Sequence, residues 1–142
     1  MRRMPDSAKG AAVIEFAFVL PLLLILFFGI IEFSVALYDK AILTNASREA
    51  ARAGVMYIGP ATRLTDDQVR ALALANCQDN MITFQDDAAP TVTITRTTHP
   101  DFTQQLLTVR LDYNYTGLGL GTLLTAMSGP IEISASTTMK NE

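Results

Sequence analysis

The stretch GAAVIEFAFVLPLLLILFFGIIEFSVALYDKAILTNASREAARAGV, residues 10–55, decides the fold of this 142-residue chain. Residues 16–31 of this stretch carry no charge, and only Pro21 and Gly29 interrupt the run of apolar side chains. With its few flanking residues, a helix rising about 1.5 Å per residue covers a hydrocarbon core of roughly 30 Å. The sequence therefore predicts one transmembrane helix over about residues 12–37.

Helical character continues beyond the apolar run, because alanine is frequent and proline is absent up to Val55. On a helical wheel the polar side holds Asn45, Arg48, Glu49 and Arg52, and the opposite side holds Leu43, Ala46, Ser47, Ala50, Gly54 and Val55. Small residues such as Ala46, Ala50 and Gly54 let another helix or a sheet approach closely. We predict one long helix from about Ala11 to Tyr57, ended by Gly59-Pro60.

The remaining residues predict a small head. Thr65 to Gln68 fits a capping box, which predicts a short helix to about Asn76. Apolar and polar residues then alternate, which predicts strands at residues 91–97, 106–115 and 131–137. An antiparallel sheet of these strands would pack its apolar face on the outer half of the long helix.

The predicted fold class is therefore α+β, with a pilin-like long helix packed on about three antiparallel strands. We divide the chain into a cytoplasmic leader (residues 1–10), a long helix (residues 11–58) and an extracytoplasmic head (residues 59–142). The basic residues do not decide the orientation, because three precede the apolar run and three follow it closely. A short N-terminal flank without a folded domain is typical of an exported chain, and this places the head outside.

The composition gives little support to catalysis or ligand binding. The chain has one cysteine, Cys77, and one histidine, His99, which cannot form an internal disulfide or, as a pair, a zinc site. We expect Cys77 to be a small buried residue, with an interchain link as the alternative, and His99 and Asp86-Asp87 to be solvated loop residues. The eleven acidic and eight basic residues from Asp39 onward exclude a nucleic-acid surface. We predict no enzyme, no cofactor, no metal and no small-molecule substrate.

Glu15 separates the possible roles of the apolar run. A secreted protein would be cut at a small-residue site, here after Ala36, but such signals have shorter apolar regions. An uncleaved anchor of an accessory or binding domain fits the length, yet it gives Glu15 no purpose, although an acid in lipid carries a cost. We expect Glu32 to be an interfacial acid rather than an intersubunit contact, and Pro21 to kink the helix.

A third interpretation uses more of these residues. A basic leader ends in Lys9-Gly10, Ala11 follows, and Glu15 is the fifth residue after the glycine, with Phe16 next. This arrangement resembles the processing motif of type IV pilins in the tight-adherence (Flp) branch. Together with Pro21, the GIIEF sequence and the closing NASREAARAG, the segment is similar to the TadE-like family of minor pilins.

The resemblance implies cleavage by a prepilin peptidase between Gly10 and Ala11, on the cytoplasmic side of the bacterial inner membrane. It assigns Lys9, Phe16 and Pro21 to recognition or assembly. It also implies that Glu15 pairs with the N-terminal amine of a neighbouring subunit, which makes a carboxylate in lipid tolerable.

The partners implied by this family are the peptidase, other pilin-like subunits, the inner-membrane assembly platform and membrane lipid. The implied function is that of a minor pilin, or pseudopilin, in pilus biogenesis and hence surface adhesion. A TadF-like relative stays open, whereas the short head argues against the longer TadG type. Whether the subunit enters the filament or only primes its assembly also stays open.

Overall fold

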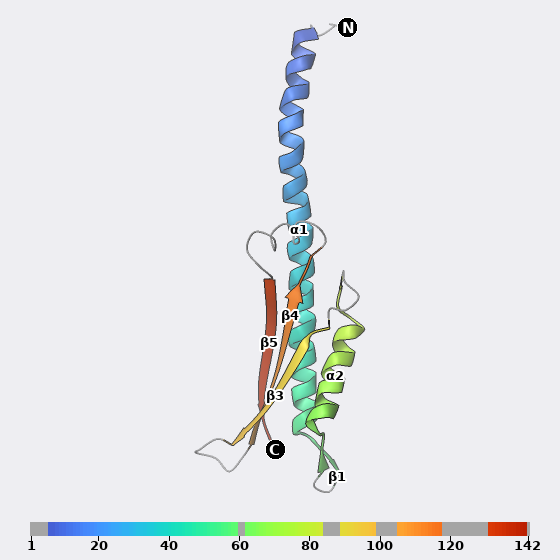
Figure 1. The fold of residues 1–142 in the computed structure, drawn as a ribbon, viewed down its shortest axis with the longest axis vertical. Helices are drawn as coiled ribbons and strands as arrows, with labels where there is room; N and C mark the ends of the chain where they lie inside the picture. The colour runs from blue at the N-terminus through green and yellow to red at the C-terminus, as the bar shows by residue number, and fades with distance from the viewer. Residues whose placement is uncertain (1–5, 60–61, 84–88, 99–104, 118–130, 142) are drawn as a thin grey trace.

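The computed structural model describes residues 6–59, 62–83, 89–98, 105–117 and 131–141. Its elements are α1 (Asp6–Val55), β1 (Tyr57–Gly59), β2 (Thr62–Arg63), α2 (Asp66–Gln78), β3 (Thr91–Thr98), β4 (Gln105–Tyr115) and β5 (Ile131–Lys140). Figure 1 shows α1 as a long rod whose N-terminal part stands alone, while α2 and the strands lie along its C-terminal part. The predicted α+β fold is confirmed. His99, Asp86 and Asp87 lie outside the described residues.

Helix α1 has 50 residues, which corresponds to a length of about 75 Å. It passes through Pro21 without interruption. A proline lacks the amide hydrogen that would bond the preceding turn. The helix nevertheless continues on both sides of Pro21, and the expected kink stays a prediction. The rod therefore connects its exposed N-terminal part directly to the part that carries the head.

Three strands form an antiparallel sheet in the order β3-β4-β5, with β4 in the centre. Ile94 on β3 pairs with Val109 on β4, and Val109 in turn pairs with Thr137 on β5. Because side chains alternate between the two faces of a strand, this register directs one apolar row of β4 towards α1 and α2. That row, Leu107, Val109, Leu111, Tyr113 and Tyr115, is buried. The three strands predicted from alternation are thus confirmed, each one to three residues longer than expected.

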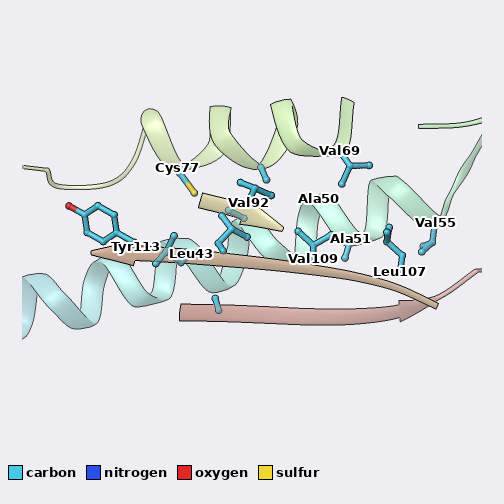
Figure 2. Close-up of a cluster of buried hydrophobic side chains, with 14 of the residues drawn as sticks. Leu43, Ala50, Ala51, Val55, Val69, Cys77, Val92, Leu107, Val109 and Tyr113 are labelled. Atoms are coloured by element: carbon cyan, nitrogen blue, oxygen red, sulfur yellow. The ribbon is translucent and has the colours of Figure 1, made fainter. Parts of the chain in front are cut away.

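The core lies between the sheet, α2 and the C-terminal half of α1 (Figure 2). Leu43 and Ala50 from α1, Val69 from α2 and Val109 from β4 are all fully buried. Cys77 is also fully buried, on α2, as expected for a small structural residue. Burial raises the pKa of its thiol to about 11, so it stays protonated and unreactive at neutral pH.

Helix α2 begins with the predicted capping box. The Thr65 hydroxyl accepts a hydrogen bond from the Gln68 amide at 3.4 Å, and the Gln68 side chain accepts one from the Thr65 amide at 3.0 Å. Arg96 on β3 then binds the Asp66 carboxylate at 2.7 Å. This pair links the start of α2 to β3 at the edge of the sheet, while Val69, Ala73 and Cys77 pack α2 into the core.

The end of α1 differs from the prediction. The helix ends at Val55 rather than near Tyr57, and Tyr57–Gly59 forms β1, which pairs with β2 in a small antiparallel hairpin. Pro60, the expected helix stop, lies outside the described residues. A strand of two or three residues is too short to show a period, so alternation alone could not reveal this hairpin.

Candidate functional site

The N-terminal half of α1 exposes an almost unbroken apolar surface. Its most apolar window of 18 residues has a mean hydropathy of 2.7, and none of that window is buried within the chain. The large side chains from Val13 to Ile31 are exposed on every side of the helix. By length and composition, this helix can cross a membrane. An all-round apolar surface that the chain itself leaves uncovered is typical of a segment that lipid or other helices cover.

The predicted cleavage residues lie at the start of this exposed surface. Gly10 and Ala11 are exposed residues of α1. A Cβ added at Gly10 would meet no atom within 4 Å, so packing within the chain does not require a glycine here. The backbone of Lys9 is helical, and its side chain lies outside what the structure describes. The site is therefore accessible, and cleavage between these residues stays a prediction.

Glu15 and Phe16 are exposed on α1, one helical turn beyond Ala11. Four residues of helix separate Ala11 from Glu15 by a rise of about 6 Å. The head lies at the opposite end of the rod (Figure 1), so it cannot cover this carboxylate. The arrangement leaves Glu15 available to a group that another chain would supply.

The small residues proposed for helix packing have their partners within the same chain. Ala46, Ala50 and Gly54 are buried against the head. A Cβ on Gly54 would lie 2.5 Å from the Leu107 side chain and 2.9 Å from that of Val69. These small residues therefore let α2 and the sheet approach α1 closely. They pack against the head of their own chain rather than against a neighbouring subunit.

Glu32 lies where the exposed and covered halves of α1 meet. The sequence predicted an interfacial acid within reach of water, and the structure shows this residue buried instead. Its side chain is only 8% exposed. The hydroxyl of Tyr115 donates to the Glu32 backbone carbonyl at 3.3 Å. Burial, followed by the charge of Glu32, raises the pKa of Tyr115, so the phenol remains a hydrogen-bond donor at physiological pH. The acid is covered by the head of its own chain.

Asp39, two turns further along α1, is fully buried. One carboxylate oxygen accepts a hydrogen bond from the Ile82 amide at 3.0 Å. The other, Oδ2, is buried without a hydrogen-bond partner in the described part of the chain. Burial raises the pKa of Asp39, and the bond from Ile82 opposes this rise only in part. Asp39 thus links the segment after α2 to the long helix, at a position where burial disfavours the ionised carboxylate.

Sequence reasoning missed the role of these two acids because it treated them as flanks of a membrane segment. Their spacing held a usable signal. Glu32, Asp39 and Leu43 lie within about 40° of one another on a helical wheel. Extending the apolar stripe of Leu43 back towards the membrane would have placed both acids on the face that the head covers.

Comparison with known families supports the resemblance seen in the sequence. Residues 10–52 match the family model described as TadE-like protein. Searches of the curated proteins and of the solved structures found no significant match. The matched residues span the exposed apolar surface, the boundary at Glu32 and most of the helix that packs against the head. The chain therefore carries a TadE-like segment at residues 10–52, which associates it with the tight-adherence pilus system.

Proposed function

We propose that this chain is a minor pilin-like subunit of the tight-adherence pilus machinery, processed by a prepilin peptidase after Gly10. It is held in the bacterial inner membrane by α1, with residues 1–10 in the cytoplasm and the head outside, and it acts in pilus assembly and hence adhesion. The observation that supports this most is the TadE-like match, which falls on an exposed apolar helix. The role is structural rather than catalytic.

Glu15 gives the proposal its mechanism. In the membrane an isolated carboxylate carries a free-energy cost, which falls when a cation lies beside it. After cleavage, the new amine at Ala11 is such a cation, and a second subunit shifted along the helix axis can bring its amine to Glu15. The exposed positions of both residues on α1 are compatible with this contact.

Two other roles compete with this one. An uncleaved membrane-anchored domain of a secretion system would share the whole fold, so only processing and assembly separate it from the proposal. A secreted protein cut after Ala36 fits less well, because Val35 and Ala36 pack against the core and Glu32 lies beneath Tyr115. Such a cut would remove a contact of the head and sever a continuous helix.

The first test is the N-terminus of the protein isolated from its native host. Intact mass or N-terminal sequencing should show a chain that starts at Ala11. A start at Met1 would support the uncleaved anchor, and a start at Leu37 would support the secreted form. Either result would remove the proposed processing step.

The glycines of α1 provide a matched test of that step. Gly10→Ala should block processing while membrane insertion continues. Gly29→Ala is the control, since Gly29 is also a helix residue with no atom within 4 Å of an added Cβ. It should be processed normally. Equal processing of both variants would count against the pilin-like role.

Glu15→Ala tests assembly separately from cleavage. The variant should reach the membrane and be cut normally, but pilus formation on the cell surface should fall, because the partner amine loses its carboxylate. Glu15→Asp keeps the charge and should retain more assembly than Glu15→Ala. Normal piliation by Glu15→Ala would exclude the contact proposed for this residue.

A further inference from the structure

The head of this protein begins on α1 without a linker. Among the residues that the structure describes, its first contact along the helix is at Glu32, where the Tyr115 hydroxyl donates to the backbone carbonyl. One turn further on, Val35 and Ala36 are half-buried against the core. On the side that faces the head, the surface that lipid can reach therefore ends at about Ile31, before the end of the span predicted from the sequence.

The exposed length that remains matches a bilayer. Residues 12–31 comprise 20 residues, which as a helix cover about 30 Å, the thickness of a typical hydrocarbon core. If the core of the membrane occupies this length, Glu32 lies at its outer boundary. Tyr38, on a part of α1 that the head leaves exposed, then lies at the headgroup level, where tyrosine is enriched.

The same boundary brings one end of the head to the membrane. Ile131 starts β5 directly opposite Tyr115 and is 38% exposed. Ile82, whose amide is bonded to Asp39, is 42% exposed about two helical turns further out. We call Ile131 and Ile82 the apolar rim.

Charged groups near the apolar rim limit how deeply this end of the head can enter a bilayer. Glu132, next to Ile131, is exposed and lies 3.9 Å from the Arg110 guanidinium. Such a pair is tolerated among headgroups and not in the hydrocarbon core. The rim thus fits the interface of a bilayer, where apolar side chains enter the boundary between headgroups and acyl chains.

We propose that the apolar rim docks on the lipid bilayer, so that the head is seated on the membrane surface in a fixed orientation. The membrane is the partner because Ile131 lies opposite Tyr115, whose hydroxyl binds the Glu32 carbonyl directly after the exposed apolar part of α1. The proposal depends on membrane anchoring and not on the pilus role. A docked head would also have to leave the lipid surface before a neighbouring subunit could use that end.

The chain contains no tryptophan, so the fluorescence of a single introduced tryptophan comes from that position alone and reports its depth in the bilayer. We would place the full chain in lipid nanodiscs and measure fluorescence quenching by lipids brominated near the headgroup and along the acyl chain. Phe27→Trp marks the membrane span, Ile131→Trp and Ile82→Trp mark the rim, and Met56→Trp marks the far end of the head. Met56 is 51% exposed and lies 24 residues, or roughly 36 Å, beyond Glu32.

Quenching should fall in the order Phe27→Trp, Ile131→Trp, Ile82→Trp and Met56→Trp. Ile131→Trp should show at least half the quenching of Phe27→Trp with lipid brominated near the headgroup, and Met56→Trp should show almost none. Glu132→Trp reports the same strand end from an exposed position and serves in place of Ile131→Trp if that variant unfolds. Circular dichroism would verify the fold of each variant.

The outcomes separate docking from anchoring. If Phe27→Trp is quenched while Ile131→Trp and Glu132→Trp match Met56→Trp, the head does not dock, although the anchor stands. If Phe27→Trp is not quenched, the span itself is wrong and docking fails with it. Equal quenching at Ile131 and Met56 above background would show a head lying flat, which also contradicts the proposed orientation.

Discussion

The two halves of α1 belong to one continuous helix but have opposite surroundings. In the N-terminal half, Leu22 is 70% exposed, and large apolar side chains surround the helix on all sides. In the C-terminal half, Leu43, Ala46 and Ala50 are buried under the head. The opposite side of that half carries exposed polar residues such as Arg48.

The difference shows that the size and placement of apolar residues identify what covers a helix better than total hydrophobicity does. A ring of large apolar residues needs a partner on every side, which a lipid phase provides. A single stripe of small residues needs one close neighbour, which here is the sheet with α2. The change from one pattern to the other occurs at Glu32, which among the described residues of α1 is the first that is buried.

The largest expected effect on stability comes from truncating a leucine in the core, and truncating a leucine on the exposed half of α1 is the comparison. Leu107→Ala should lower the free energy of unfolding of the head by about 2–5 kcal/mol, because it removes a fully buried side chain and leaves a cavity. Leu22→Ala should leave the stability of the head unchanged. The measurement is thermal unfolding of the full chain in detergent micelles, followed by the near-ultraviolet signal of the tyrosines. Similar losses in both variants would show that the halves do not differ as described.

Much of this comparison could be predicted from the sequence. The apolar run, the small stripe with Ala46 and Gly54, and the capping box at Thr65 each follow a local pattern with one physical cause. The strands followed from alternation, because one face of the sheet is buried and the other is solvated. Each of these signals lies within a few neighbouring residues.

A second pair of substitutions tests the close approach in the covered half. Gly54→Ala places a methyl group against Leu107 and Val69, and overpacking of this kind costs about 1–3 kcal/mol. The higher helix propensity of alanine offsets up to about 1 kcal/mol of this loss. Gly29→Ala meets open space and should cause no loss. Thermal unfolding should show a lower midpoint for Gly54→Ala and an unchanged midpoint for Gly29→Ala. An unchanged midpoint for Gly54→Ala would mean that the side chains of Leu107 and Val69 move away at little cost.

What the sequence could not provide depends on contacts between distant residues. The helical wheel places Asp39 on the same side of α1 as Leu43, but only the structure shows that the Ile82 amide is the group that binds its carboxylate. The same holds for Glu32, which is covered by a tyrosine 83 residues away in the sequence. Local patterns carry no record of which distant side chain will cover an acid. The predicted cleavage and recognition residues, Gly10, Lys9 and Glu15 among them, depend on other proteins, and the fold alone does not test them.

Asp39 offers a smaller effect, which depends on pH. Because burial raises its folded pKa above the unfolded value of 3.8, ionised Asp39 destabilises the fold, and this penalty is complete above the folded pKa. Asp39→Asn removes the titration while it can keep the bond from Ile82. The stability of the original chain relative to Asp39→Asn should therefore rise as pH falls through the folded pKa and become constant below about 3.8. Unfolding midpoints of both chains between about pH 3 and 8 would show this, and a constant difference would mean that Asp39 does not titrate in that range.

The smallest effect tests where the two halves of α1 meet. Tyr115→Phe removes only the hydroxyl that donates to the Glu32 carbonyl, which should cost about 0.5–1.5 kcal/mol. Tyr38→Phe is the control, because Tyr38 is exposed on α1 and loss of its hydroxyl should change stability by less than about 0.5 kcal/mol. Backbone hydrogen exchange near Glu32 should also increase in Tyr115→Phe and stay the same in Tyr38→Phe, since the Tyr115 hydroxyl contacts the helix backbone at this position. If exchange near Glu32 is equal in both variants, the head is not fastened at this residue, and the boundary between the halves lies further along α1, near Asp39.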